Sequence, residues 1–284
     1  MLTNALLYAG LLPLVVSACL AVILRQLRLT PQISWPVSIT AGFLAAMLVV
    51  RGQGGLAESI DRVLHPHEAL DWLPVLVLLA LVACGVVYWG SLRSWQLIPL
   101  VVAISLATPV RLLSGNLAQQ WSPIGKLAVI AWTSAALALA WLSLSTNDTA
   151  QPSVLRVPLQ ILVAVGAGVA VTLSGAFIYG QLAAAVGAAT TGTWLAFALR
   201  ARESNEGTAA AAGVVAVALG SLILLGRFYS ELTTAAAALL FVALAATAMP
   251  LPGQSGGNAS WLRAVVRAAC CLVPLAIAVA LAVS

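Results

Sequence analysis

The sequence predicts an all-α, polytopic membrane protein with about ten transmembrane helices joined by short loops. Three observations lead to this fold class. Of the 284 residues, 62% are hydrophobic and only 7% are charged, with a mean hydropathy of +1.06. Soluble domains carry about 25% charged residues, so a soluble fold is excluded. The apolar stretches lack the alternation of barrel strands, and each is long enough for a helix to cross a hydrocarbon core of about 30 Å.

The connections between these stretches are short, so the whole chain, 1–284, is expected to form a single integral membrane domain. A looser division separates a Leu-, Val- and Trp-rich half, 1–150, from an Ala- and Gly-rich half, 151–284. The predicted spans are 5–24, 34–50, 72–90, 95–113, 124–144, 156–175, 181–200, 208–226, 232–249 and 260–281.

The first span contains "VVSAC", which looks like a lipoprotein processing site ending at Cys19. No Lys or Arg precedes it, as a signal peptide would need, and the apolar run continues beyond Cys19. We therefore expect a retained first helix. Cys84, Cys270 and Cys271 also fall within predicted spans without metal-ligand spacing, and all four cysteines are expected to be small packing residues. No cofactor is predicted.

The basic residues give the expected orientation, because cytoplasmic loops carry an excess of Lys and Arg. Alternate connections divide them into two sets, one with seven and one with five members. The larger set is Arg25, Arg28, Arg93, Arg156, Arg200, Arg202 and Arg263, and the smaller is Arg51, Arg62, Arg111, Lys126 and Arg227. Both termini are therefore predicted outside, with a bacterial-type inner (plasma) membrane as the location. Seven tryptophans, Trp35 and Trp141 among them, lie near span ends and are expected at the headgroup level.

The most polar stretch of the chain is "HPHEALDW" at 65–72, which follows "LAESIDRVL". His65 and His67 are weak metal candidates, because no zinc-helix spacing surrounds them. An amphipathic surface helix with an apolar stripe at Leu56, Ile60, Val63 and Leu64 explains the stretch more simply. Glu68 and Asp71 precede the third span, where the helix dipole favours negative charge.

The fourth span contains Pro109 and Arg111. A proline-bent helix with a nearby charge is typical of transporter sites, which makes Arg111 a candidate ligand-binding residue. Prolines are also ordinary in membrane helices, so this feature has a structural explanation as well.

Two similar stretches, "GAFIYGQLAAA" at 175–185 and "GRFYSELTTA" at 226–235, lie midway in long apolar runs. This arrangement predicts repeated helical hairpins, with tips at 174–181 and 225–231 on the same side of the membrane and six to eight residues long. Arg227 and Glu231, four residues apart, would then form a modest exposed ion pair. In the alternative, a re-entrant region forms a polar cavity, whose lining residues would be Tyr179, Gln181, Arg227, Tyr229 and Glu231.

Small residues recur in the seventh span, where Ala184, Ala188 and Gly192 form one stripe and Ala183, Gly187 and Thr191 another. Such stripes let helix backbones approach closely in lipid. Tight helix packing is therefore expected in this region.

For function, the leading hypothesis is a small-solute transporter or permease-like protein. The first alternative is a non-catalytic membrane subunit or scaffold within a larger complex, and the second is a membrane-embedded enzyme. The enzyme is disfavoured because no catalytic motif or acid pair lies within a span. The expected partners are the lipid bilayer and a membrane protein or second copy, and no nucleic acid is expected because the basic residues are scattered singly.

In size and span number, divisible as five plus five, the chain is similar in outline to the drug/metabolite transporter type of carrier. Membership would imply that both termini lie inside, opposite to the orientation that the basic residues predict. No motif carries this resemblance.

Overall fold

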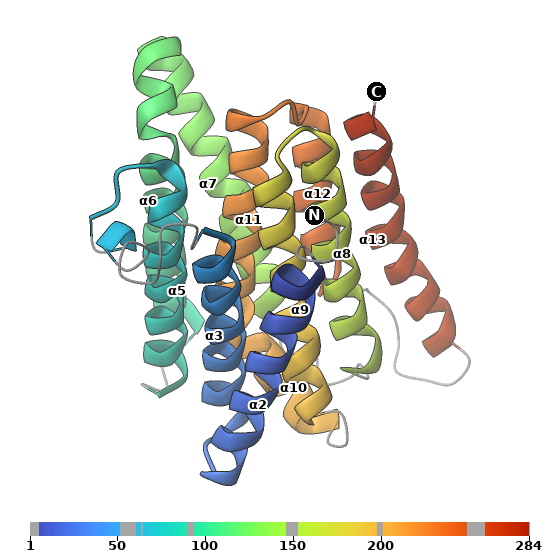
Figure 1. Cartoon of the computed structure of the whole chain (residues 1–284). Coiled ribbons are helices and arrows are strands. Elements are labelled where there is room, and N and C mark those ends of the chain that lie inside the picture. Colours follow the sequence, from blue (N-terminus) through green and yellow to red (C-terminus); the bar gives the residue numbers. More distant parts are fainter. Residues whose placement is uncertain are drawn as a thin grey trace.

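The computed structural model describes residues 6–51, 61–63, 65–89, 94–145, 153–197, 201–248 and 259–283, and every regular element in them is a helix. The long helices run roughly parallel to one axis (Figure 1). In chain order the elements are η1 (Leu6–Leu11), α2 (Leu12–Gln26), α3 (Pro31–Arg51), η3 (Ala69–Asp71), α5 (Trp72–Trp89), α6 (Ser94–Gln120), α7 (Pro123–Ser145), α8 (Ser153–Leu173), α9 (Phe177–Phe197), α10 (Ala201–Ala210), α11 (Ala212–Tyr229), α12 (Thr234–Ala246) and α13 (Ala259–Val283).

Eight helices within the described residues are long and apolar enough to cross a membrane, which identifies a multi-pass helical membrane protein. Every predicted span falls on a helix. However, α9 and the 13-residue α12 are not among the eight, so the count of ten crossings stays a prediction. The predicted amphipathic helix before the third span lies mostly at 52–60 and at position 64, outside the described residues.

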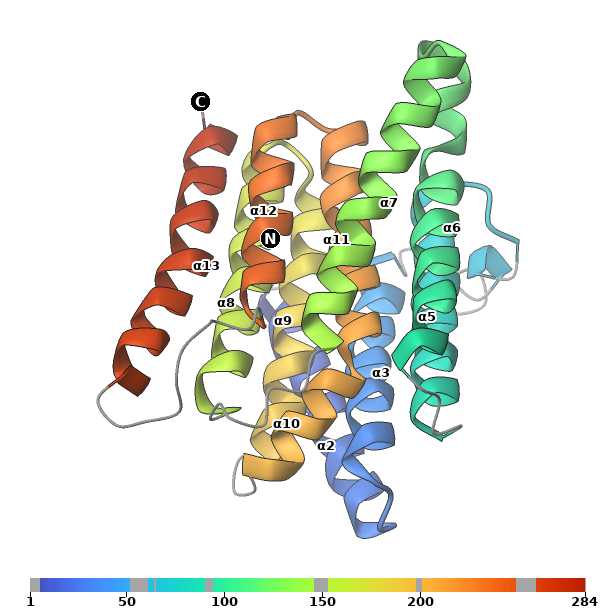
Figure 2. The same cartoon turned by 180° about the vertical axis from the view of Figure 1, so that it is seen from behind.

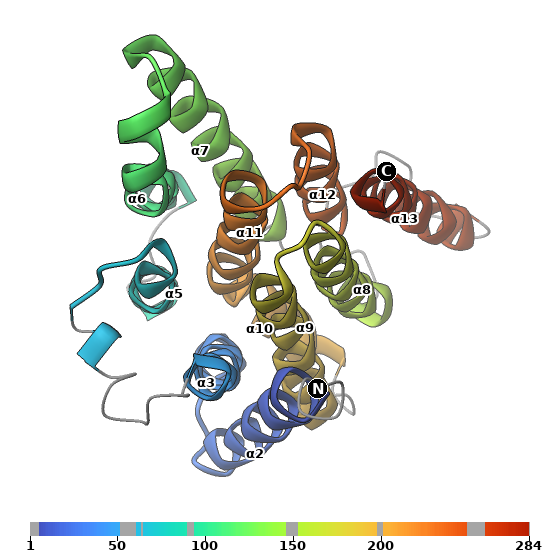
Figure 3. The same ribbon diagram turned by 45° about the horizontal axis from the view of Figure 1, so that its top comes forward.

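Helix α11 occupies the centre of the bundle, and every residue from Ala212 to Gly226 is buried (Figures 2 and 3). It packs against α5, α6, α7, α9 and α12. Two glycines make this close approach feasible. A Cβ on Gly213 would lie 2.3 Å from the ring of Trp141, and a Cβ on Gly220 would lie 2.5 Å from Leu137. Larger residues at these positions would push the surrounding helices away from α11.

Two tryptophans expected at the lipid headgroups are instead buried inside the protein. Trp141 is 2% exposed and fills the space beside Gly213. Trp35 is 0% exposed, lies against Gly207 of α10 and has its ring 5.9 Å from that of Phe197. Their positions at span ends are therefore explained by aromatic packing onto glycine.

The small residues of α9 give the close packing that their spacing predicts. A Cβ on Gly192 would lie 2.1 Å from the Leu14 carbonyl oxygen of α2. On another face, a Cβ on Gly187 would lie 3.3 Å from Ala164 of α8. Helix α9 is thus held between two neighbours at nearly backbone-to-backbone distance.

The turn from α8 to α9 is Ser174–Ala176, and its geometry is a Schellman motif. Gly175 has a φ of 87°, and its N–H donates to the Thr172 carbonyl, at 3.1 Å. The next N–H, of Ala176, donates to the Val171 carbonyl, at 3.2 Å. A glycine in the left-handed conformation is the usual way to end a helix, as the sequence indicates here.

The turn from α11 to α12, Ser230–Thr233, lies directly beside the first turn. The Glu231 N–H donates to the Ser174 carbonyl at 3.1 Å, and the hydroxyls of Ser174 and Ser230 are 3.2 Å apart. Both turns lie at the upper end of the bundle in Figure 1. The predicted tips are therefore at the same end of the protein and in contact.

The two hairpins nevertheless differ from the predicted repeat. The turns span three and four residues rather than six to eight. Phe177 and Tyr179 follow their turn and begin α9, whereas Phe228 and Tyr229 precede theirs and end α11. The local sequence similarity thus aligns positions on opposite sides of a turn, and the hairpin repeat is not confirmed.

Replacement of Gly175 by alanine tests the Schellman turn. We expect Gly175→Ala to destabilise the protein by about 1–2 kcal/mol, because an L-residue with a Cβ is strained in the left-handed region. The measurement is the free energy of unfolding in bicelles. Gly85→Ala is the matched control, since a Cβ there meets no atom within 4 Å and the residue lies inside α5. An equal loss in both variants would contradict the assignment.

Candidate functional site

An open cavity of about 860 Å³ lies beside the turn Ser174–Ala176, which is at the upper end of α8 and α9 in Figure 1. The end of α3, the connection ahead of α5, the start of α9 and the end of α11 all contribute to its wall. The described lining residues are Val50, Arg51, Arg62, Glu68, Ala69, Leu70, Gly175, Ala176, Phe177, Ile178, Tyr179 and Tyr229. The cavity therefore combines charged groups on one wall with aromatic and apolar groups on another.

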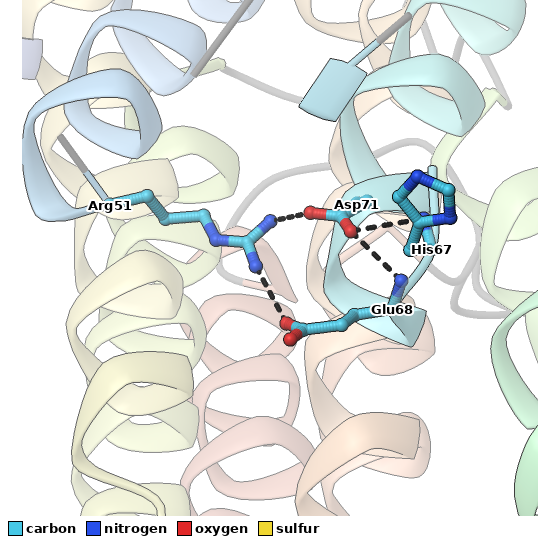
Figure 4. Close-up of polar contacts among 4 residues, drawn as sticks. All are labelled: Arg51, His67, Glu68 and Asp71. Atoms are coloured by element: carbon cyan, nitrogen blue, oxygen red, sulfur yellow. Dashed lines mark hydrogen bonds and ion pairs between the residues drawn. The ribbon is translucent and has the colours of Figure 1, made fainter. Parts of the chain in front are cut away.

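Arg51 joins α3 to the segment that precedes α5 (Figure 4). Its Nη1 donates to Oδ1 of Asp71, and its Nη2 donates to Oε2 of Glu68, at 3.0 Å. The three side chains differ sharply in exposure, at 13% for Arg51, 2% for Asp71 and 70% for Glu68. The guanidinium thus makes one buried and one exposed ion pair.

Asp71 has a second role in the capping box of η3, the single turn that leads into α5. Its Oδ2 accepts the backbone N–H of Glu68 at 2.8 Å and that of His67 at 3.2 Å. A carboxylate at a helix start satisfies N–H groups that have no partner within the helix and interacts favourably with the dipole. The sequence-based interpretation of Asp71 is correct, and the structure adds the pair with Arg51.

The two tyrosines of the cavity come from different helices. Tyr229, the last residue of α11, donates its hydroxyl to the Leu112 carbonyl of α6 at 2.8 Å. Tyr179 lies in the first turn of α9 and is half-buried. Tyr179 and Tyr229 therefore line the same cavity.

The other three residues of that hypothesis lie elsewhere. Arg227 donates its Nε to the Thr234 hydroxyl, at 2.8 Å, and lies 5.5 Å from the ring centroid of Phe228. Glu231 is exposed in the turn, and among the described side chains no ion pair joins it to Arg227. The helix ends at Tyr229 and Ser230 is extended, so the i, i+4 geometry required for that pair is lost.

Gln181 lies on the opposite face of α9 from the polar cavity. It lines a second, mostly apolar cavity of about 720 Å³ formed by the start of the chain, α8 and α9. Tyr179 and Gln181 are two residues apart, about 200° around a helix, which explains why they face different spaces. The similarity between the stretches 175–185 and 226–235 therefore does not place Gln181 and Glu231 in one site.

Arg111 lies near the cavity without lining it. Its Cζ is 4.8 Å from the centroid of the Trp72 ring, a cation–π contact that ties α6 to the start of α5. Since Trp72 is the first residue of α5, the contact places Arg111 beside the start of that helix.

The two histidines are not brought together as metal ligands. His65 Nδ1 lies 3.1 Å from Asp61, with both side chains exposed, whereas His67 contributes its backbone N–H to Asp71. Within the described part of the chain, no group of three or more His, Cys, Asp or Glu residues is placed to hold a metal ion.

Sequence reasoning missed Arg51 and Glu68 as one charged wall of a cavity. A signal was present, since an arginine ends one span and two acids begin the next, and consecutive helices of a bundle usually lie side by side.

A scan against protein-family models, a search of curated proteins and a search of solved structures each gave no match.

The buried pair predicts a large difference between two acids at the same end of the bundle. Asp71→Ala should lower the free energy of unfolding by about 3 kcal/mol, because it leaves the mostly buried Arg51 without its buried partner and removes a cap. Glu231→Ala should change it by less than about 0.5 kcal/mol, as exposed substitutions usually do.

Denaturation in bicelles measures both variants, and Arg227→Ala extends the comparison. A loss in Glu231→Ala as large as in Asp71→Ala would show that Glu231 has a buried partner after all.

Proposed function

We propose that this protein is a small-solute transporter of the permease type, and that the polar cavity is its solute-binding site. The volume of the cavity, about 860 Å³, carries the proposal, because small-molecule sites measure about 300–1,000 Å³. Such sites combine apolar and aromatic walls with a few polar groups that fix the orientation of the ligand. Tyr179, Tyr229 and Phe177 supply the first kind of wall here, and Arg51 and Glu68 supply the second.

In this proposal the chain crosses a bacterial-type inner membrane ten times, with α9 and α12 included, and both termini lie outside. The cavity would then open to the outside. Two arginines at the opposite end support that end as the cytoplasmic one. Arg25 donates to the Ala196 carbonyl at 2.9 Å, and Arg156 donates to the Leu144 carbonyl, so both stabilise helix C-termini there.

A route through the bundle would need polar groups along it. Buried hydroxyls of Ser38 and Thr40 on α3, Ser105 on α6 and Ser221 on α11 have no hydrogen-bond partner within the described residues. Other buried hydroxyls, such as that of Thr108, bond to the carbonyl four residues before them. Hydroxyls without such a bond are available to water or solute, which supports transport.

The burial of α11 favours the second candidate, a scaffold subunit that packs against another membrane protein. Ser221 is the one polar residue between Ala212 and Gly226, so the centre of this helix offers nothing ionisable. Transport of a charged solute would require an opening of the bundle, whereas a scaffold would not.

The proposed orientation predicts opposite labelling at two exposed positions. In a chain whose four cysteines are replaced, Glu231→Cys should react with an impermeant thiol reagent on intact cells. Leu27→Cys, at the other end of the bundle and 67% exposed, should react only after permeabilisation. The reverse pattern would place the termini and the cavity inside, and equal reaction of both on intact cells would contradict the helix arrangement.

Uptake into proteoliposomes tests the function itself. Protein-containing vesicles are incubated with a mixture of amino acids, sugars, organic acids and polyamines, and their content is measured by mass spectrometry against empty vesicles. We expect at least one solute class to accumulate, and Ala176→Trp, which fills the cavity, to lower its uptake at least tenfold. Glu231→Trp adds the same bulk outside the cavity and should leave uptake unchanged.

Thermal unfolding in detergent confirms that both tryptophan variants are folded. No accumulation of any solute by folded protein would favour the scaffold. Uptake that is unchanged by Ala176→Trp would show that the solute takes another path.

A further inference from the structure

We propose that the cavity binds a small solute with a carboxylate group, and that Glu68 occupies the place of this carboxylate when no solute is bound. The inference rests on the proposed solute-binding function and names its substrate class. It follows from the different exposure of the two acidic partners of Arg51, since Asp71 is buried and Glu68 is exposed.

Asp71 is the fixed partner of Arg51. Its side chain is 2% exposed, and one carboxylate oxygen meets Arg51 while the other accepts two backbone N–H groups. Moving Asp71 would leave the mostly buried guanidinium without its buried partner and would break the capping box of η3. Asp71 therefore sets the position of Arg51 and leaves Nη2 directed at the cavity wall.

Glu68 is the exchangeable partner. Its side chain is 70% exposed, and its Oε2 lies 3.0 Å from Nη2 of Arg51. An exposed ion pair is weak, because water solvates both groups and the side chain loses rotamer freedom. Glu68 can therefore turn into solvent at little cost and expose one N–H edge of the guanidinium to the cavity.

The position that Glu68 holds selects the chemistry of the ligand. A guanidinium N–H makes a strong, charge-assisted hydrogen bond to a carboxylate oxygen, and Nη2 of Arg51 already makes one to the carboxylate of Glu68. Arg62 also lines the cavity, so the lining has two arginines and one glutamate. With Asp71 balancing Arg51, a single negative charge on the solute would take over the role of Glu68.

The rest of the solute would meet the other wall. Phe177, Ile178, Tyr179 and Tyr229 provide aromatic and apolar surface a short distance around the cavity. An aromatic or short aliphatic acid would place its carboxylate at Arg51 and its body against these side chains. Binding is then an exchange of one carboxylate for another, in which Glu68 competes with the solute and lowers its affinity.

The experiment measures benzoate binding to the full-length protein in nanodiscs by calorimetry, with benzamide as the neutral isostere. We expect Glu68→Gln to bind benzoate about two- to fivefold more tightly than the wild type, which is the range expected for removal of an exposed ionic competitor. Benzamide should gain nothing. Glu231→Gln, which removes the same charge in the turn outside the cavity, should bind benzoate like the wild type.

Arg51→Lys keeps the positive charge beside Asp71 but loses the separate Nη2 group that contacts Glu68, so benzoate binding should fall at least tenfold. If this variant does not fold, the comparison of Glu68→Gln with Glu231→Gln still decides. Equal or weaker benzoate binding by Glu68→Gln overturns the proposal, and so does tighter binding by both glutamine variants, since that would reflect general surface charge.

The outcome separates this inference from the proposed function. If Glu68→Gln binds benzoate more tightly but the protein accumulates no solute, the carboxylate site is supported and the transport function is contradicted. If Ala176→Trp abolishes solute uptake but neither the wild type nor Glu68→Gln binds benzoate, transport through the cavity is supported and a carboxylate solute is contradicted.

Discussion

The complete burial of α11 is the constraint on which the rest of the structure depends. Lipid tails are as apolar as leucine, so helices in a membrane gain little from hydrophobic burial and associate through close packing instead. A central helix with neighbours on all sides needs small residues where those neighbours approach. Gly213 and Gly220 meet this need, with Trp141 and Leu137 filling the space in front of them.

This packing determines where charge can lie. A helix buried from Ala212 to Gly226 has no place for an ionisable side chain, so its first charged residue, Arg227, comes where the helix approaches its end. The same holds for α3, which carries Arg51 at its last position. The ends of the helices at one end of the bundle are thus the natural place for a polar site. The cavity forms there because the connection ahead of α5 and the turn Ser174–Ala176 lie on either side of it.

The sequence was sufficient to predict the fold class and the helices, because length and composition alone distinguish a bilayer-spanning helix from other elements. It also indicated Gly175 as a helix end and placed the two turns on the same side of the membrane. It could not identify which side chains share a cavity. Tyr179 and Gln181 are close in sequence but face different spaces, whereas Tyr179 and Arg51 line one cavity from helices far apart in the chain.

The same limit explains the tryptophans. A position near a span end is compatible with lipid headgroups and with protein packing, and only the partner decides between them. Trp35 is buried because Gly207 lies opposite, more than 150 residues later in the chain. The composition of a segment does not show which distant residue will pack against its tryptophan. The ion pair of Arg227 and Glu231 failed for a local reason, since the helix ends between them and four residues of spacing imply contact only within a helix.

The walls of the cavity differ in how firmly they are held, and this difference bears on how a solute would act. The wall at α9 is joined to the neighbouring turn by the hydrogen bonds of Ser174 with Ser230 and with the N–H of Glu231. Helix α9 itself packs closely against α2 and α8. The opposite wall is held by Arg51, with Asp71 as the buried anchor and Glu68 as the exposed contact. A solute that replaces Glu68 would break the contact of Glu68 with Arg51, while the pair of Arg51 with Asp71 stays in place. Any movement that binding causes should therefore begin around Glu68, just ahead of η3 and α5, and not in the hairpins.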